Sequence, residues 1–137
     1  MILEIYKGIE EYLLEHNLIS REDLDKAKVE AAQTGKPLED VLLDKHLVDK
    51  LNLTKARAEA LGIEFVDIKD VEIPREILDL VPRDIAARYK LVPFEKSGTE
   101  IKVAMADPLD LQVINFLERR TGLKVIPFMA VEEDIDV

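Results

Sequence analysis

The amino-acid sequence predicts an α+β fold, with a helical N-terminal lobe of two repeated helical hairpins followed by a small α/β lobe with a three- to four-stranded sheet. Two observations support this prediction. Residues 13–24 and 42–53 share one apolar pattern at an offset of 29 positions, which indicates a repeated unit. After Gly62 the apolar residues change from helical spacing to alternation, as is typical of strands. We therefore expect a helical repeat lobe over residues 1–61 and an α+β lobe over residues 62–137.

The first copy of the repeat is predicted to contain two helices. Apolar residues recur at helical spacing over residues 3–16, and Asn17 can end this helix because Asn tolerates the left-handed conformation. Ser20 is a suitable N-cap for a second helix that runs to about residue 33, where Gly35 provides a stop signal. The expected buried residues of the second helix are Leu24, Ala27 and Ala31.

The second copy follows the same pattern. Pro37 suits the first turn of a helix, where its missing N–H is harmless. His46 stands where the first copy has Asn17, and Asp49 replaces Ser20 as the cap. Gly62 is expected to end the last helix. Because two copies are too few for a solenoid, we expect a pseudo-symmetric pair of hairpins.

The α+β lobe is predicted from alternation, prolines and turn residues. A hairpin turn over residues 96–99 joins two of the strands, and Asp107-Pro108 starts a helix from Leu109, which Gly122 ends. A last helix begins at Glu132–Ile135 and the sequence stops there, so we expect a fragment of a longer protein. The predicted strands are residues 63–68, 91–94, 101–105 and 124–129, and the predicted helices are residues 75–80, 83–89 and 109–120.

Composition narrows the function class. The chain has 137 residues and a net charge of −10, which argues against nucleic-acid binding and against adhesion to an anionic membrane surface. No apolar run approaches the ~18 residues of a membrane-spanning helix, so direct membrane insertion is not expected. The absence of cysteine excludes disulfides and thiolate metal sites and suits a cytosolic protein.

The sequence shows no catalytic constellation. It lacks the Gly-x-x-x-x-Gly-Lys-Ser/Thr pattern of a phosphate-binding P-loop. His16 and His46 lie near equivalent turns, but a two-histidine metal site needs further ligands, so we interpret both as turn residues. Ser20 and Ser97 are expected to be a cap and a turn residue. We therefore expect no catalytic residue and no metal site within these residues.

Three segments resemble one known family. They are Leu61–Asp67, Leu80–Tyr89 and the distinctive Val-Ala-Met-Ala-Asp-Pro-Leu-Asp of Val103–Asp110. Together they resemble the N-terminal domain of type II secretion and type IV pilus assembly ATPases, the GspE/PilB class. The repeated helical half is similar to the MshE type of this domain, and the resemblance covers about residues 9–135.

The resemblance implies a regulatory and protein-docking domain rather than the motor itself. Its expected partners are the cytoplasmic domain of an inner-membrane platform protein and the ATPase core of its own parent chain. No cofactor is expected in this fragment, whereas ATP and magnesium would bind the parent protein. The implied location is cytoplasmic, peripheral to the inner membrane through partners. The secretion and pilus branches share these motifs, and a free-standing adaptor protein is a further alternative.

Another alternative is a cyclic di-GMP sensor, because some pilus relatives bind this ligand with their helical repeat. The family motif has Arg-Leu-Gly, a later Gly and a Gln, whose arginine offers a fork of donors and whose glycine allows close approach. This chain keeps the apolar skeleton and changes the polar and glycine positions, so a degenerate motif is the expectation. These positions hold Gly8, Glu10, Asn17 and Ala31 in the first copy and Pro37, Glu39, His46 and Ala60 in the second.

Overall fold

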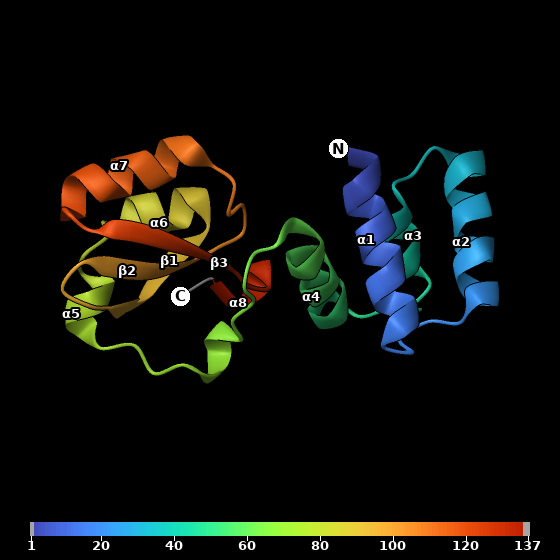
Figure 1. Cartoon of the computed structure of the whole chain (residues 1–137), viewed down its shortest axis with the longest axis horizontal. Coiled ribbons are helices and arrows are strands. Elements are labelled where there is room, and N and C mark those ends of the chain that lie inside the picture. The colour runs from blue at the N-terminus through green and yellow to red at the C-terminus, as the bar shows by residue number, and fades with distance from the viewer. Residues whose placement is uncertain (1, 136–137) are drawn as a thin grey trace. The chain divides into compact units, whose positions relative to one another are not determined.

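The computed structural model describes residues 2–135, and the chain divides into two compact units, residues 1–62 and 63–137. The helical unit contains α1 (Ile2–Glu15), α2 (Arg21–Thr34), α3 (Leu38–Asp44) and α4 (Lys50–Leu61) (Figure 1). The α+β unit contains η1 (Ile68–Asp70), α5 (Arg75–Leu78), α6 (Arg83–Tyr89), β1 (Leu91–Lys96), β2 (Glu100–Met105), α7 (Leu111–Thr121), β3 (Lys124–Met129) and α8 (Glu132–Ile135). The predicted α+β class is therefore confirmed. Within residues 2–135, no helix combines the length and the apolar character needed to cross a bilayer.

The turn between the two helices is built identically in both copies of the repeat. Asn17 and His46 adopt the left-handed conformation, with φ angles of 55° and 57°. The Leu18 N–H then donates to the Leu13 carbonyl at 2.9 Å, and the Leu47 N–H donates to the Leu42 carbonyl at 3.0 Å. These bonds satisfy carbonyl groups that the end of a helix leaves free. The predicted helix end at Asn17 is confirmed.

The helix that follows each turn starts with a side-chain cap. The Ser20 hydroxyl accepts the Asp23 N–H at 3.1 Å, and the Asp49 carboxylate accepts the Asn52 N–H at 2.8 Å. Each cap satisfies one of the N–H groups that lack a partner within the first turn. Both predicted caps are confirmed, and α2 and α4 end at Gly35 and Gly62 in left-handed conformation, as expected.

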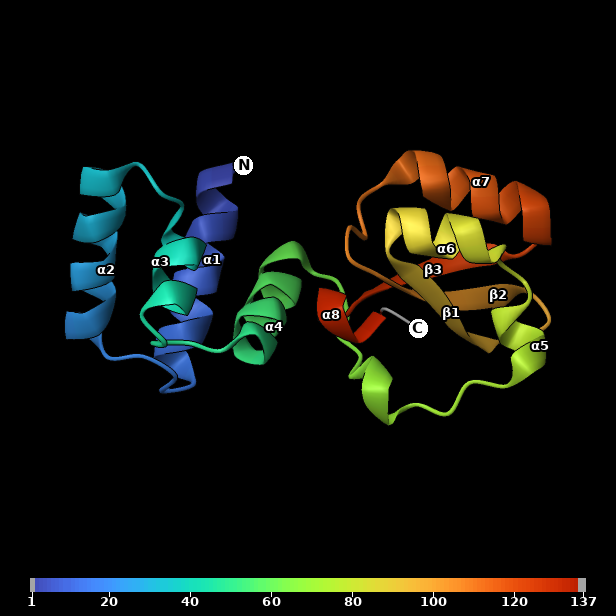
Figure 2. The same cartoon turned by 180° about the vertical axis from the view of Figure 1, so that it is seen from behind.

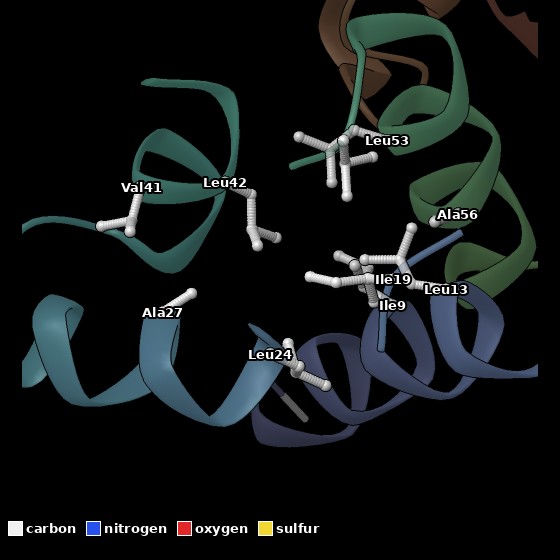
Figure 3. Close-up of a cluster of buried hydrophobic side chains, with 10 residues drawn as sticks. Ile9, Leu13, Ile19, Leu24, Ala27, Val41, Leu42, Leu53 and Ala56 are labelled. Atoms are coloured by element: carbon white, nitrogen blue, oxygen red, sulfur yellow. The ribbon is translucent and has the colours of Figure 1, made fainter. Parts of the chain in front are cut away.

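The helical unit is held together by contacts between the two copies. α1 packs against α4, and α2 packs against α3, so each helix pair joins one copy to the other. Leu13, Leu24 and Leu42 are fully buried, and Figure 3 shows side chains from all four helices converging on one core. Ala27 and Ala56 also belong to this core, and their small side chains let the packed helices approach closely.

The α+β unit is a three-stranded sheet with helices on both faces. The strand order is β1-β2-β3, with β1 and β2 antiparallel and β2 and β3 parallel. On one face of the sheet, Leu91 and Val103 pack against α6 and against Leu117 of α7. On the other face, Phe94 and Phe128 pack against α5 and α8. Figure 2 shows α6 and α7 together on one side of the sheet. β1 is an edge strand that α5 and α6 contact.

The predicted strand over residues 63–68 is wrong. This segment meets β3 at one bridge, between Phe65 and Met129. The Val66 N–H donates to the Met129 carbonyl at 2.9 Å, and the Met129 N–H donates to the Glu64 carbonyl at 2.8 Å. The chain then turns into η1, so the pairing ends at once. Alternating apolar side chains indicate an extended segment, but they do not show whether a partner strand is hydrogen-bonded along that whole segment.

Two predicted helix boundaries also need correction. The helix predicted over residues 109–120 begins at Leu111 rather than Leu109, because the Asp110 carboxylate accepts the Val113 N–H at 3.3 Å. The Asp107 carboxylate instead accepts the Leu109 N–H at 3.1 Å, which forms a turn before the helix. The helix predicted over residues 75–80 ends at Leu78. Asp107 and Asp110 are both possible caps, and the sequence alone does not choose between them. The end of α5 differs from its prediction by two residues, which is the usual uncertainty of a helix boundary.

Candidate functional site

The motif positions of the helical repeat fall into two groups in space. Gly8 of α1 faces Ala60 of α4, and a Cβ atom added at Gly8 would lie only 3.0 Å from the Ala60 Cβ. The equivalent positions of the other pair, Pro37 and Ala31, line a cavity of about 350 Å³ together with Glu10. The structure therefore closes one group by direct helix contact and leaves the other open.

Glu10 and Glu39 are each held by a basic residue of the same copy. Lys28 donates to the Glu10 carboxylate at 2.9 Å, and the Arg57 guanidinium pairs with the Glu39 carboxylate. The two pairs are related by the 29-residue offset of the repeat. The carboxylate side chains are only 20% and 18% exposed, so solvent screens these pairs less than it screens surface pairs.

One oxygen of this repeated pair lacks a partner. The Glu39 Oε1 atom is buried and accepts no hydrogen bond within the described part of the chain, while Oε2 of the same carboxylate bonds Arg57. A buried acceptor without a donor is costly, so Arg57 is the group that keeps this carboxylate stable inside the fold. Neither ion pair could be predicted from the sequence, because the partners lie 18 positions apart and on different helices.

The remaining motif positions and the histidines lie elsewhere. Asn17 and His46 are exposed at the two turns and do not line the 350 Å³ cavity. The His16 ring stacks on Tyr12, with ring centroids 4.0 Å apart, and its Nδ1 lies 2.9 Å from the Tyr12 carbonyl. Among residues 2–135, no group of three or more His, Asp or Glu residues is arranged to hold a metal ion.

A second cavity, which sequence reasoning missed, lies at the β1 end of the sheet in the α+β unit. It has a volume of about 380 Å³ and lies beside β1, with walls from α5, α6 and α8. Its floor is apolar and includes Leu78, Val81 and Leu91. Four charged side chains of the described residues also line it, namely Arg75, Asp79, Arg83 and Lys90. The signal in the sequence was the concentration of arginines around the two short helices that Pro74 and Pro82 open.

Comparison with known families and proteins identifies similar sequences. Residues 61–137 match the MshEN domain. The type IV pilus assembly ATPase PilB of Myxococcus xanthus (strain DK1622) is 29% identical over 125 residues, which cover 91% of this chain and 22% of the relative. PilB of Thermus thermophilus is 31% identical over 123 residues, which cover 88% of this chain and 14% of the relative. The chain thus spans less than a quarter of the length of these relatives.

Solved structures show the same fold. A structure of MshE with cdg, the dinucleotide cyclic di-GMP, has a TM-score of 0.68 at 23% identity and covers 93% of this chain and 92% of that one. The N-terminal domain of XpsE has a TM-score of 0.57 at 25% identity and covers 96% of this chain and 91% of that one. Both likenesses include the helical and the α+β units.

Proposed function

Because this chain belongs to the MshEN domain family, we propose that it is a regulatory and docking domain, without catalysis of its own, of a type IV pilus or type II secretion assembly ATPase. One observation carries the proposal: the similarity to PilB extends over 91% of this chain but only 22% of the relative. The proposed motor, the ATPase core, would therefore lie in a part of the parent protein outside this sequence. ATP and magnesium would bind there, since this sequence has no Gly-x-x-x-x-Gly-Lys-Ser/Thr pattern.

The proposed partners are the ATPase core of the parent chain and the cytoplasmic domain of an inner-membrane platform protein. The domain would then work on the cytoplasmic side of the inner membrane, held there by these partners. Each unit has its own apolar core, so either can present a rigid surface to a partner. Rigid surfaces bind with a smaller loss of conformational freedom, which favours a docking role.

The test compares the parent ATPase with a variant that lacks this chain. Both proteins are purified, their ATP hydrolysis is measured, and their binding to the cytoplasmic region of the platform protein is measured by calorimetry. We expect hydrolysis in both proteins, and we expect the deletion to remove platform binding and, in the host, pilus assembly or secretion. Unchanged platform binding by the shortened protein would contradict the proposal.

A second candidate function is cyclic di-GMP sensing. The observation that favours it is the 350 Å³ cavity, which gathers the motif positions Glu10, Ala31 and Pro37 in a fold that MshE, solved with cdg, shares. Two features weigh against it. Glu10 places negative charge in the cavity beside a dianionic ligand, and Lys28, a cation that lines the cavity, is already paired with Glu10. We therefore place the sensor second.

Calorimetry with cyclic di-GMP separates the two candidates. The ligand is titrated into the 137-residue chain at near-physiological salt, with cyclic di-AMP as the control nucleotide. Micromolar or tighter binding that is specific for the guanine ligand would make the helical unit a second-messenger sensor. The absence of heat at high ligand concentration would leave the helical unit as a scaffold.

A further inference from the structure

We propose that the cavity beside β1 in the α+β unit is the docking site for an acidic, amphipathic helix of a partner protein, whose apolar side chains enter the floor while its carboxylates meet the arginines and the lysine of the rim. This inference rests on the proposed docking function and assigns it to one surface. In that setting the partner helix belongs to the platform protein. We call this surface the edge cavity.

The position of the edge cavity makes it accessible to a partner. The strand order places β1 at one end of the sheet, where α5 and α6 contact it, and the cavity is lined by Leu91 from one face of the sheet and Val92 from the other. The cavity reaches solvent at its rim, where Arg75 and Arg83 are exposed. Leu78 of α5 and Ile135 of α8 complete the apolar floor. A volume of about 380 Å³ accommodates a few apolar side chains, which suits insertion of anchor residues.

The charge of the rim selects an acidic partner. Arg75 and Arg83 are exposed and Lys90 is half-buried, and within residues 2–135 none of the three forms an ion pair. Among residues 2–135, Asp79 is the single acidic side chain that lines the cavity. This local excess of positive charge occurs in a chain whose net charge is −10, so it is not a consequence of composition. Carboxylates of a partner would supply the missing counter-charges.

The conformation of β1 favours a helix over an added strand. Pro93 lies in the middle of this edge strand and has no N–H, so a strand paired there would lose a ladder hydrogen bond. The register with β2 also shifts between Pro93 and Glu95, which is a bulge that bends the edge. Both features oppose continued strand pairing, whereas side chains from a helix need no ladder.

The distribution of polar groups favours a protein segment over a small molecule. Small-molecule pockets usually combine an apolar lining with a few polar groups placed inside. No polar or charged side chain is fully buried in the described part of the chain, so the charged side chains that line the edge cavity lie at its rim and not on its floor. An apolar centre surrounded by a charged, solvated rim is the usual anatomy of a protein–protein interface.

The test titrates a designed peptide into the isotopically labelled 137-residue chain and follows the backbone amides by NMR. The probe is a helix of about four turns with Leu and Phe on one side and Glu along its borders. A second peptide carries Gln in place of every Glu, and laurate is titrated separately. We expect the acidic peptide to shift the amides of residues 75–93 and of Ile135, with at least about tenfold weaker binding of the Gln peptide.

Two variants test the site itself. Arg75→Glu with Arg83→Glu reverses the rim charge, and Ala87→Trp places a bulky ring in the cavity at an exposed position. Each of the two changes should weaken the binding of the acidic peptide by about tenfold or more. The matched control, Arg119→Glu with Arg120→Glu, makes the same charge change on exposed residues of α7 and should leave binding unchanged. The amide spectrum of each variant reports whether it remains folded.

The outcomes are distinct. Shifts outside residues 75–93 and Ile135, equal binding of both peptides, or equal losses in the rim and control variants would overturn the proposal. Binding of laurate but of neither peptide would overturn it in favour of a small amphiphilic anion. If the peptide fails while the full domain still binds the platform protein, the edge cavity is wrong and the docking function stands. If the peptide binds as expected but removing the domain leaves platform binding intact, the docking function is wrong.

Discussion

The two units of this protein treat their basic residues differently. In the helical unit Lys26, Lys28, Lys36, Lys45 and Arg57 are all in ion pairs with acidic residues of the same unit. In the α+β unit the cations around the edge cavity form no ion pair within residues 2–135. Paired charges stabilise a scaffold, and unpaired charges remain available to a partner. Under the proposed docking function, the unpaired cations of the edge cavity are the groups that a partner would meet.

The largest expected effect tests whether the two copies of the repeat contribute equally to the stability of the helical unit. Leu13 and Leu42 occupy equivalent positions of the repeat and are both fully buried. Leu13→Ala and Leu42→Ala should each lower the free energy of unfolding by about 3 kcal/mol, because each leaves a similar cavity in the core. Urea denaturation measures the loss. A difference of more than about 1.5 kcal/mol between the two variants would show that the copies are not energetically equivalent.

The next largest effect tests the close contact between Gly8 of α1 and Ala60 of α4. Gly8→Val should lower the free energy of unfolding by about 2 kcal/mol, because the new side chain meets Ala60 of α4. Adding Ala60→Gly should recover part of this loss, since it removes the nearest atom. Thermal denaturation of the two single variants and the double variant gives the coupling. Additive effects would mean that α1 and α4 are not in tight contact at this point.

A smaller effect distinguishes the repeated ion pairs from surface ion pairs. Arg57→Met should cost about 1 to 2 kcal/mol, because the largely buried Glu39 carboxylate would lose its cation. Lys26→Met is the control, since Lys26 and Glu22 are 73% and 79% exposed, and it should cost less than about 0.5 kcal/mol. Equal losses in urea denaturation would show that the Glu39 pair contributes no more than an exposed one.

The smallest expected effect concerns the ion pair between Lys102 and Glu95 on the sheet, which changes the pKa of Lys102. A hydrogen bond from Lys102 to Glu95, followed by their charge attraction, raises the pKa of Lys102. A raised pKa in the folded state means that the contribution is complete below the ordinary lysine pKa and is lost as pH rises through the folded value, above about pH 10. Stability should therefore fall more steeply there in the unchanged chain than in Glu95→Gln. Parallel pH profiles of the two proteins would refute this.

Local chemistry made most of the helical unit predictable. Ser20, Asp49 and Asn17 act within a few residues of their own position, so their roles follow from residue type and spacing. The predicted strand over residues 63–68 failed for the opposite reason. Its pairing depends on Met129, which is remote in the sequence, and on the turn that starts at Ile68.

The candidate sites were less predictable than the fold. The motif positions could be numbered from the sequence, but the pairing of Glu10 with Lys28 depends on how α1 and α2 are placed by the core. The edge cavity is lined by residues of α5, α6, β1 and α8, and no local pattern connects these elements. What the sequence could supply was the concentration of arginines near Pro74 and Pro82.

The packing of α1 against α4 also has a consequence for synthesis on the ribosome. α1 is made before α4, the helix that covers it, and α4 ends at Leu61. The apolar face of α1 therefore stays uncovered until nearly the whole helical unit has left the exit tunnel. Because translation proceeds at roughly 5–20 residues per second, this interval is on the order of seconds, long enough for a chaperone to bind. Exchanging the order of the two copies in the gene would not shorten it, since the first helix would still pack against the last.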